Sequence, residues 1–149
     1  EGAVLADEVG LGKSQMSIMS FGKQIRAGGA AIVVSTLSTK QQWRDEIMEV
    51  MAGDPPALFI IDGEGAKSRA RELEWAKSSA RGTPSVLVIH HDALRRDAKH
   101  IAPLLVKLRP HVPSITCVLD EASCVIKSAH TKSWQAAMLI GRRCTHRIA

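Results

Sequence analysis

Two short motifs contain the residue types that bind and hydrolyse a nucleoside triphosphate. The first is GLGKS, in which Gly10, Gly12, Lys13 and Ser14 follow a strand-like segment and precede a helix-like one. Glycines let backbone N–H groups converge on phosphate oxygens, and the helix points its positive end at the same anion. Lys13 would neutralise β/γ-phosphate charge, and the Ser14 hydroxyl would coordinate Mg²⁺. The alternative is a glycine turn before a surface helix with a solvated lysine, but the flanking segments favour the phosphate site.

The second motif, LDEAS, places Asp120 and Glu121 directly after an apolar strand-like run. Ligands of α/β proteins bind at the carboxyl ends of the strands. Phosphate hydrolysis needs a carboxylate that holds Mg²⁺, usually through water, and a second group that orients the attacking water. Asp120 suits the first role and Glu121 the second. A solvated Asp-Glu turn is the alternative, and the presence of the phosphate motif in the same chain argues against it.

Apolar strand-like segments alternate with helix-like segments along the whole chain. The predicted strands are residues 3–6, 30–35, 57–61, 85–89, 115–119 and 145–149. The predicted helices are residues 14–27, 39–51, 66–80, 98–108 and 133–140, the fourth with a turn or kink at Pro103. The strands are continuous apolar runs, which indicates burial on both faces, as in a parallel sheet covered by helices. The alternation predicts an α/β fold with right-handed crossover connections and a mainly parallel central sheet.

Composition sets wider limits. The 149 residues are 45% hydrophobic and 23% charged, which predicts one soluble domain, and no apolar run approaches the length of a membrane span. The net charge of +5 fits a polyanionic partner, and it fits a mildly basic domain without one equally well. The cysteines lack metal-ligand spacing, so we expect small buried side chains in a reduced, cytosolic protein. The sequence lacks an initiator Met and stops inside an apolar run, so we expect it to be part of a longer polypeptide.

Three polar or basic groups could contact a nucleic-acid backbone. Thr36, Ser38, Thr39 and Lys40 follow a strand and open a helix, which suits a phosphate cradle and an ordinary helix cap equally. A basic cluster follows the fourth strand and is either a phosphate contact or a solvated helix face; it contains Arg95, Arg96, Lys99 and His100. A third group could face DNA, another domain or water; it contains Arg142, Arg143, His146 and Arg147. The three Trp residues lie among apolar residues on predicted helices, so core packing is favoured over base stacking.

The string LADEVGLGKS resembles LADEMGLGKT of the Swi/Snf-related ATPases, a family in helicase superfamily two. In that family Asp replaces the first glycine of the general phosphate-loop pattern, which accounts for Asp7, and Ser14 stands for the usual Thr with its hydroxyl kept. Three further strings resemble family motifs in the same order: AIVVSTLSTKQQWRDEI, SVLVIHHDALRRD and DEAS. The final RCTHRIA resembles the approach to the family's TGTP or TATP motif. Ser123 departs from the His that is common in the DEAH-type box.

The resemblance implies a RecA-like P-loop three-layer sandwich. Residues 1–149 would be the first lobe of a helicase ATP-binding domain, truncated at both ends, with the second lobe outside this sequence. The implied activity is hydrolysis of ATP with Mg²⁺, which drives translocation along duplex DNA or remodelling. The alternatives are an RNA helicase or restriction-type translocase of the same superfamily, and a nucleotide-binding scaffold that does not hydrolyse ATP. The location would be cytoplasmic and nucleoid-associated if the protein is bacterial or from a phage, and nuclear if it is eukaryotic.

The resemblance also assigns residues to roles. The implied nucleotide contacts are Asp7, Glu8, Val9, Gly10, Leu11, Gly12, Lys13, Ser14 and Gln15. The implied catalytic groups are Lys13, Asp120 and Glu121, with Ser14 and Asp120 serving Mg²⁺. The predicted nucleic-acid contacts are Ser35, Thr36, Ser38, Lys40, Arg95 and Arg96.

Overall fold

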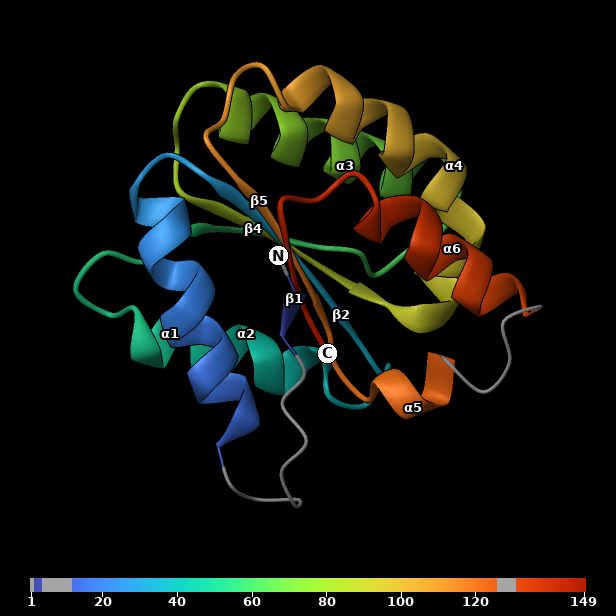
Figure 1. Ribbon diagram of the computed structural model, residues 1–149, viewed down its shortest axis with the longest axis horizontal. Helices are drawn as coiled ribbons and strands as arrows, with labels where there is room; N and C mark the ends of the chain where they lie inside the picture. The colour runs from blue at the N-terminus through green and yellow to red at the C-terminus, as the bar shows by residue number, and fades with distance from the viewer. Residues whose placement is uncertain (1, 4–11, 126–130) are drawn as a thin grey trace.

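A six-stranded parallel sheet forms the middle layer of the molecule, in a computed structural model that describes residues 2–3, 12–125 and 131–149 (Figure 1). The strands are β1 (Gly2–Ala3), β2 (Ala30–Ser35), β3 (Ala57–Ile60), β4 (Ser85–His90), β5 (Ile115–Leu119) and β6 (His146–Ile148). Their spatial order is β1-β6-β5-β2-β4-β3, and every recorded pair is parallel. The helices are α1 (Lys13–Arg26), α2 (Lys40–Val50), α3 (Ala66–Ala80), α4 (His91–Leu108), α5 (Ala122–Val125) and α6 (Lys132–Gly141). The predicted α/β fold is confirmed, and its layers are those of a RecA-like sandwich.

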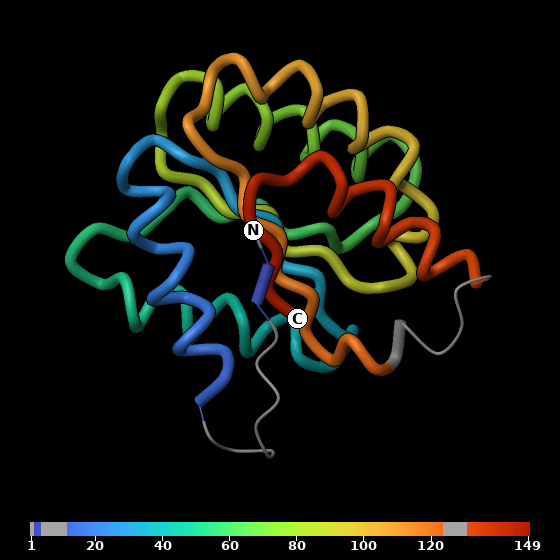
Figure 2. The backbone as a smooth tube through the Cα atoms, in the orientation of Figure 1, coloured from blue at the N-terminus to red at the C-terminus, as the bar shows by residue number. Residues whose placement is uncertain are grey.

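The helices cover the two faces of the sheet unequally. α1 and α2 lie on one face, and α3, α4 and α6 lie on the other (Figures 1 and 2). Side chains of β2 alternate between the layers, so that Ile32 packs with the second group and Val33 with the first. Both are fully buried. This burial on both faces explains why the strands read as continuous apolar runs.

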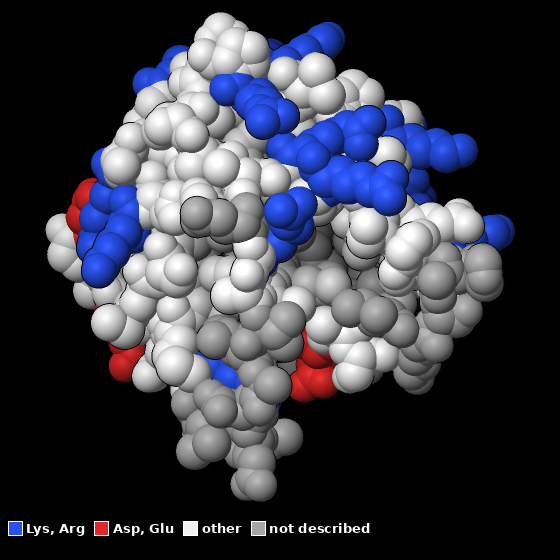
Figure 3. Space-filling model, viewed as in Figure 1, with Lys and Arg blue, Asp and Glu red and all other residues white. Residues whose placement is uncertain are grey.

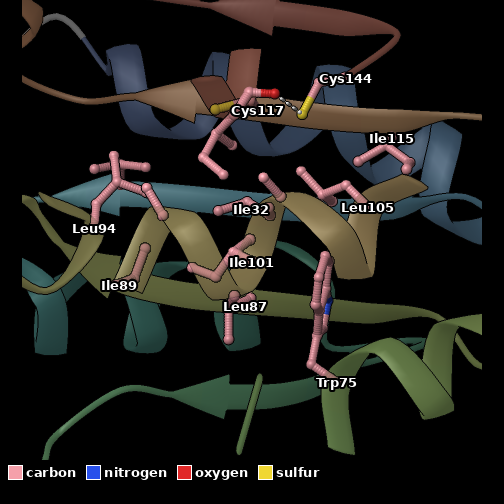
Figure 4. Packing of buried hydrophobic residues seen from close by; sticks show 14 of the residues in the cluster. Ile32, Trp75, Leu87, Ile89, Leu94, Ile101, Leu105, Ile115, Cys117 and Cys144 are labelled. Carbon is pink, nitrogen blue, oxygen red and sulfur yellow. Dashed lines mark hydrogen bonds between the residues drawn. The ribbon is translucent and has the colours of Figure 1, made fainter. Parts of the chain in front are cut away.

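The core under α3, α4 and α6 is the larger of the two (Figure 4). Trp75 of α3 and Ile101 and Leu105 of α4 are fully buried and pack against β2 and β4 through Ile32 and Leu87. Cys117 and Cys144 are free, buried thiols at the β5 side of the same core, as the sequence predicted for them. The Cys144 thiol donates to the Ile140 carbonyl at 3.4 Å. Its pKa is raised by its neighbour Cys117 and by burial, which keeps it protonated.

One helix begins earlier than predicted. The sequence predicts this helix from residue 98, but β4 runs directly into α4 at His91. His90 makes this possible because its Nδ1 accepts the Ala93 N–H at 3.2 Å, which caps the helix. Pro103 lies on the exposed side within α4 and does not end it. The short helix α5 was also not predicted.

Candidate nucleotide-binding site

The phosphate motif lies where α1 begins. Gly12 has φ 72° and ψ 28°, a left-handed conformation that glycine adopts without strain, and it forms the N-cap of α1. The first intrahelical bond runs from the Met16 N–H to the Gly12 carbonyl at 3.0 Å. The N–H groups of Ser14 and Gln15 therefore precede the helical ladder. No acidic side chain lies in this first turn to compete with an anion. Asp7, Glu8, Val9, Gly10 and Leu11 lie outside the described residues.

The acidic motif lies at the carboxyl end of β5, beside the end of β2. The Asp120 N–H continues the sheet ladder and donates to the Val34 carbonyl at 2.8 Å. Glu121 follows with φ 52°, which is uncommon for a residue other than glycine and which turns the chain out of the sheet. Its side chain is exposed, whereas that of Asp120 is half-buried. Glu121 is therefore the more accessible of the two carboxylates.

A cleft of about 600 Å³ brings the two motifs together between α1, α2 and the tip of β5. Its lining residues are Gly12, Lys13, Ser14, Gln15, Thr39, Gln42, Trp43, Glu46, Asp120 and Glu121. The volume is in the range of small-molecule and cofactor sites. Helix-terminal N–H groups, a lysine, a serine hydroxyl and two carboxylates around one space suit a triphosphate with Mg²⁺. Within the part of the chain that is described, no three His, Cys, Asp or Glu side chains converge to hold a metal by themselves.

Three residues of α2 line the cleft and were not assigned to it from sequence. Trp43 is only 3% exposed and packs in the core as predicted, but its indole Nε1 also donates to Asp120 Oδ2 at 2.8 Å. Gln42 Nε2 donates to Glu46 Oε1 at 2.7 Å. The second oxygen, Glu46 Oε2, is buried and has no hydrogen-bond partner among the described residues. The only signal in the sequence that could have placed Trp43 at the cleft is that a buried indole N–H needs a hydrogen-bond acceptor.

His91 is a further neighbour of Asp120. It begins α4, and both of its ring nitrogens are buried without a hydrogen-bond partner in the described structure. Burial lowers the pKa of His91, and the nearby Asp120 charge only partly opposes the shift. The ring is therefore neutral at physiological pH and adds no positive charge beside the carboxylate.

The predicted nucleic-acid contacts near α2 are not equally accessible. Ser35 is fully buried and its hydroxyl donates to the Thr36 carbonyl at 3.1 Å. Lys40 is buried, and its Nζ donates to Asp62 and to the Ile61 carbonyl. The hydroxyl of Thr36 accepts the Thr39 N–H at 3.2 Å, so it stabilises the turn before α2. Ser38 is exposed. A nucleic-acid role for these residues stays a prediction.

Two arginines of the basic cluster on α4, Arg95 and Arg96, form internal ion pairs. Exposed Arg95 pairs with Asp92 at 3.2 Å. Arg96 Nε and Nη2 donate to the two oxygens of Asp97 at 2.9 and 2.6 Å, and its Nη1 lies 3.1 Å from Glu64. Burial alone would raise the pKa of Asp97, but the bonds from Arg96 and Ser68 outweigh it and lower that pKa. Arg96 thus has a structural role at the start of α4, and its predicted nucleic-acid contact remains untested.

A buried carboxyl group adjoins this ion pair. Glu72 of α3 is 1% exposed, and its Oε1 lies 3.2 Å from the Ser68 hydroxyl, which also contacts Asp97 at 2.8 Å. Glu72 Oε2 has no hydrogen-bond partner among the described residues. Burial, together with the charge of Asp97, raises the pKa of Glu72 from 4.5 to about 7. The group is therefore close to half-protonated at neutral pH.

The net charge of the molecule comes from its last segment. Residues 122–149 contain five Lys or Arg and no Asp or Glu, which equals the whole net charge of +5. Lys and Arg gather on the upper part of the face in Figure 3, toward α4 and α6. Two arginines of this segment donate to carbonyls at the end of α6, Arg143 to Leu139 at 2.7 Å and Arg147 to Gly141 at 3.3 Å. Part of this basic group thus stabilises the negative end of a helix.

Comparisons with known proteins give distant similarities. No family model matches the chain. Protein CHROMATIN REMODELING 19 of Arabidopsis thaliana is 26% identical over 157 aligned positions, which cover 99% of this chain and 19% of that protein. DNA repair protein rhp54 of Schizosaccharomyces pombe is 29% identical over 111 positions, which cover 67% of this chain and 13% of that protein. The chain thus spans less than a fifth of the length of these relatives. In the described part of the chain, no helix is long and apolar enough to cross a membrane.

Proposed function

We propose that this chain binds ATP with Mg²⁺ in the cleft between α1, α2 and β5, and that it supplies the residues for ATP hydrolysis. The observation that carries the proposal is the convergence of Lys13 and Ser14 with Asp120 and Glu121 on one space. Two motifs far apart in sequence meet there in the order of elements that phosphate binding requires. An isolated glycine turn or an isolated Asp-Glu turn would not produce this arrangement.

Each residue has a separate task in the proposed site. The N–H groups at the start of α1 and the Lys13 ammonium bind the phosphate oxygens, and the glycines of the loop allow the close approach. The Ser14 hydroxyl and Asp120 hold Mg²⁺, which supplies charge neutralisation at the phosphates when it is bound. Glu121, exposed at the rim, orients the attacking water. The predicted contacts of residues 7–11 complete the loop in this proposal.

We further propose that the chain is the first RecA-like lobe of a Swi/Snf-related ATPase that acts on duplex DNA. The LADEVGLGKS string, the α/β fold and the two relatives, which are named for chromatin remodelling and for DNA repair, support it. ATP hydrolysis would drive translocation on DNA or remodelling, at the nucleoid or in the nucleus. The arginine that stabilises transition-state charge would come from a second lobe. Because such a residue contributes ~10³–10⁵ in rate, the 149-residue chain alone should hydrolyse ATP poorly.

The test measures nucleotide binding and steady-state ATP hydrolysis of the full-length protein with duplex DNA, single strands or RNA. Lys13→Ala should weaken Mg·ATP binding by roughly tenfold or more, because it removes a charged phosphate contact. Glu121→Gln should preserve binding and abolish hydrolysis. Lys23→Ala, at an exposed position near the other end of α1, is the matched control and should change neither.

The outcomes separate the alternatives. If RNA alone stimulates ATP hydrolysis, the proposed action on duplex DNA is wrong and the protein is an RNA helicase. Tight binding of ATP without turnover under any condition would favour a nucleotide-binding scaffold. Normal hydrolysis by Glu121→Gln would show that its role is misassigned, and unchanged binding by Lys13→Ala would remove the proposed phosphate site.

A further inference from the structure

Both the backbone and the side chain of Asp120 form hydrogen bonds. Its backbone N–H donates to Val34 of β2 at 2.8 Å, and its carboxylate Oδ2 accepts the indole N–H of Trp43 at 2.8 Å. The second contact joins residues 77 positions apart in sequence. The indole N–H is a donor only, and a bond to an ionised carboxylate is stronger than one between neutral groups. The orientation of this carboxylate therefore depends on a side chain of α2.

Trp43 is itself firmly placed. Its ring is 3% exposed and packs in the cluster that α1 and α2 form on the sheet, with Phe21 and Ile47 among its fully buried members. A side chain that fills a packed core has few alternative rotamers, because other positions of the ring would clash with its neighbours. The indole N–H thus reaches the cleft from a rigid support, and Trp43 lines the cleft as well.

We propose that Trp43 is the positioning residue of the metal-binding carboxylate, and that its indole N–H holds Asp120 in the orientation that Mg·ATP needs. The proposal rests on the function proposed above for the cleft. With Oδ2 bonded to the indole, the rotation of the carboxylate is restricted, and its other oxygen would be the one left for the metal or for a metal-bound water. Outer contacts of this kind orient ligands and raise the affinity of metal sites. In this role Trp43 acts through Asp120.

The main variant is Trp43→Phe, which keeps an aromatic ring but loses the N–H. In ATPase assays of the full-length protein, the Mg²⁺ concentration for half-maximal rate should rise by roughly tenfold to a hundredfold, the range for losing a hydrogen bond to a charged group. At saturating Mg²⁺, the rate of Trp43→Phe should approach that of the unaltered protein, because Lys13, Ser14 and Glu121 are unchanged. A protein that had only lost core packing would show a lower melting temperature without a shifted Mg²⁺ dependence.

Trp75→Phe is the matched control. Trp75 is also fully buried, but it lies on the opposite face of the sheet, and its Nε1 has no hydrogen-bond partner in the described structure. This variant loses the same atoms from a core without touching Asp120, so its Mg²⁺ dependence should stay that of the unaltered protein. A second variant replaces Trp43 by benzothienylalanine, which has the shape of Trp with sulfur in place of the N–H. It should fold normally and still shift the Mg²⁺ dependence.

The results distinguish two failures. If the unaltered protein neither binds nor hydrolyses Mg·ATP, the proposed function is wrong and the role of Trp43 is rejected with it. If the unaltered protein hydrolyses ATP but both Trp43 variants keep its Mg²⁺ dependence, the proposed function stands and the positioning role is rejected. A shift in both variants, absent in Trp75→Phe, supports the role.

Discussion

Glu72 makes the stability of this domain depend on pH in a way that one substitution should remove. Its carboxyl group is 1% exposed, has one oxygen without a partner among the described residues, and lies beside the charged Asp97–Arg96 pair. Burial and the charge of Asp97 raise the pKa of Glu72 to about 7 from 4.5. The folded protein therefore binds a proton at Glu72 between pH 4.5 and 7, whereas the unfolded chain has released it.

The direction and size of the change in the free energy of unfolding follow from this pKa shift. A raised pKa in the folded state means that the stabilisation from this group is complete below pH 4.5 and is lost as the pH rises through about 7. One pKa unit corresponds to about 1.4 kcal/mol, so the contribution of Glu72 to the free energy of unfolding falls by about 2–3 kcal/mol between pH 5 and pH 8. Glu72→Gln keeps the shape and cannot ionise. At pH 8 the variant should therefore be more stable than the unaltered protein by about that amount, and at pH 5 the two should be similar.

The assay is equilibrium unfolding in guanidinium chloride or by heat at several values between pH 5 and pH 8. The melting temperature of Glu72→Gln should exceed that of the unaltered protein by roughly 5–10 °C at pH 8. Comparing the two proteins at each pH cancels the titration of other groups, including His91. Glu74→Gln, on the same helix but exposed, is the control, and its melting temperature should follow that of the unaltered protein at every pH. A Glu72→Gln curve parallel to that of the unaltered protein over the whole range would refute the raised pKa.

Two further stability predictions follow from backbone geometry. Gly29→Ala should lower the free energy of unfolding by about 1–3 kcal/mol because a Cβ there would lie 2.5 Å from Ser114 Oγ, whereas Gly53→Ala, with no described atom within 4 Å, should leave it unchanged. Equal unfolding midpoints for the two variants would contradict the close packing at Gly29. Thr131→Ala should lower stability by about 1 kcal/mol, because the Thr131 hydroxyl accepts the Trp134 N–H at 3.2 Å at the start of α6. Thr131→Ser keeps the acceptor and should restore most of the loss in thermal unfolding.

The elements of this fold could largely be predicted from sequence because the central strands β2, β4 and β5 are nearly continuous apolar runs buried on both faces. The start of α4 could not, because HHDALRRD is mostly polar, and its two apolar residues, Ala93 and Leu94, are too few to show a helical period. The first turn is instead secured by His90, which accepts a backbone N–H in a capping role that the sequence does not reveal. Local pattern therefore identified the apolar second half of the helix and missed its polar beginning, although Ala93 and Leu94 are buried there.

The meeting of the two motifs could also be predicted, because parallel strands present their carboxyl ends at one edge of the sheet. The contacts that support the site could not. The bond from Trp43 to Asp120 depends on how α2 packs beside the tip of β5, and no local pattern encodes that distance. The sequence predicts Lys40 as a nucleic-acid contact. In the fold, however, Asp62 and the Ile61 carbonyl, which directly follow β3, bind its side chain.

The pairing of β1 with β6 has a consequence for the order in which the domain can assemble. In the described structure β1 pairs only with β6, through Gly2 with Arg147 and Ala3 with Ile148, so the first and last strands are neighbours (Figure 2). A ribosome releases the N-terminal strand long before the C-terminal one. Among the described strands, β1 thus has no partner until β6 is synthesised, and β2, β4 and β5 can form the centre of the sheet before β1 joins it. Pairing of β1 is then a late event in the assembly of this sheet, coupled to docking of β6.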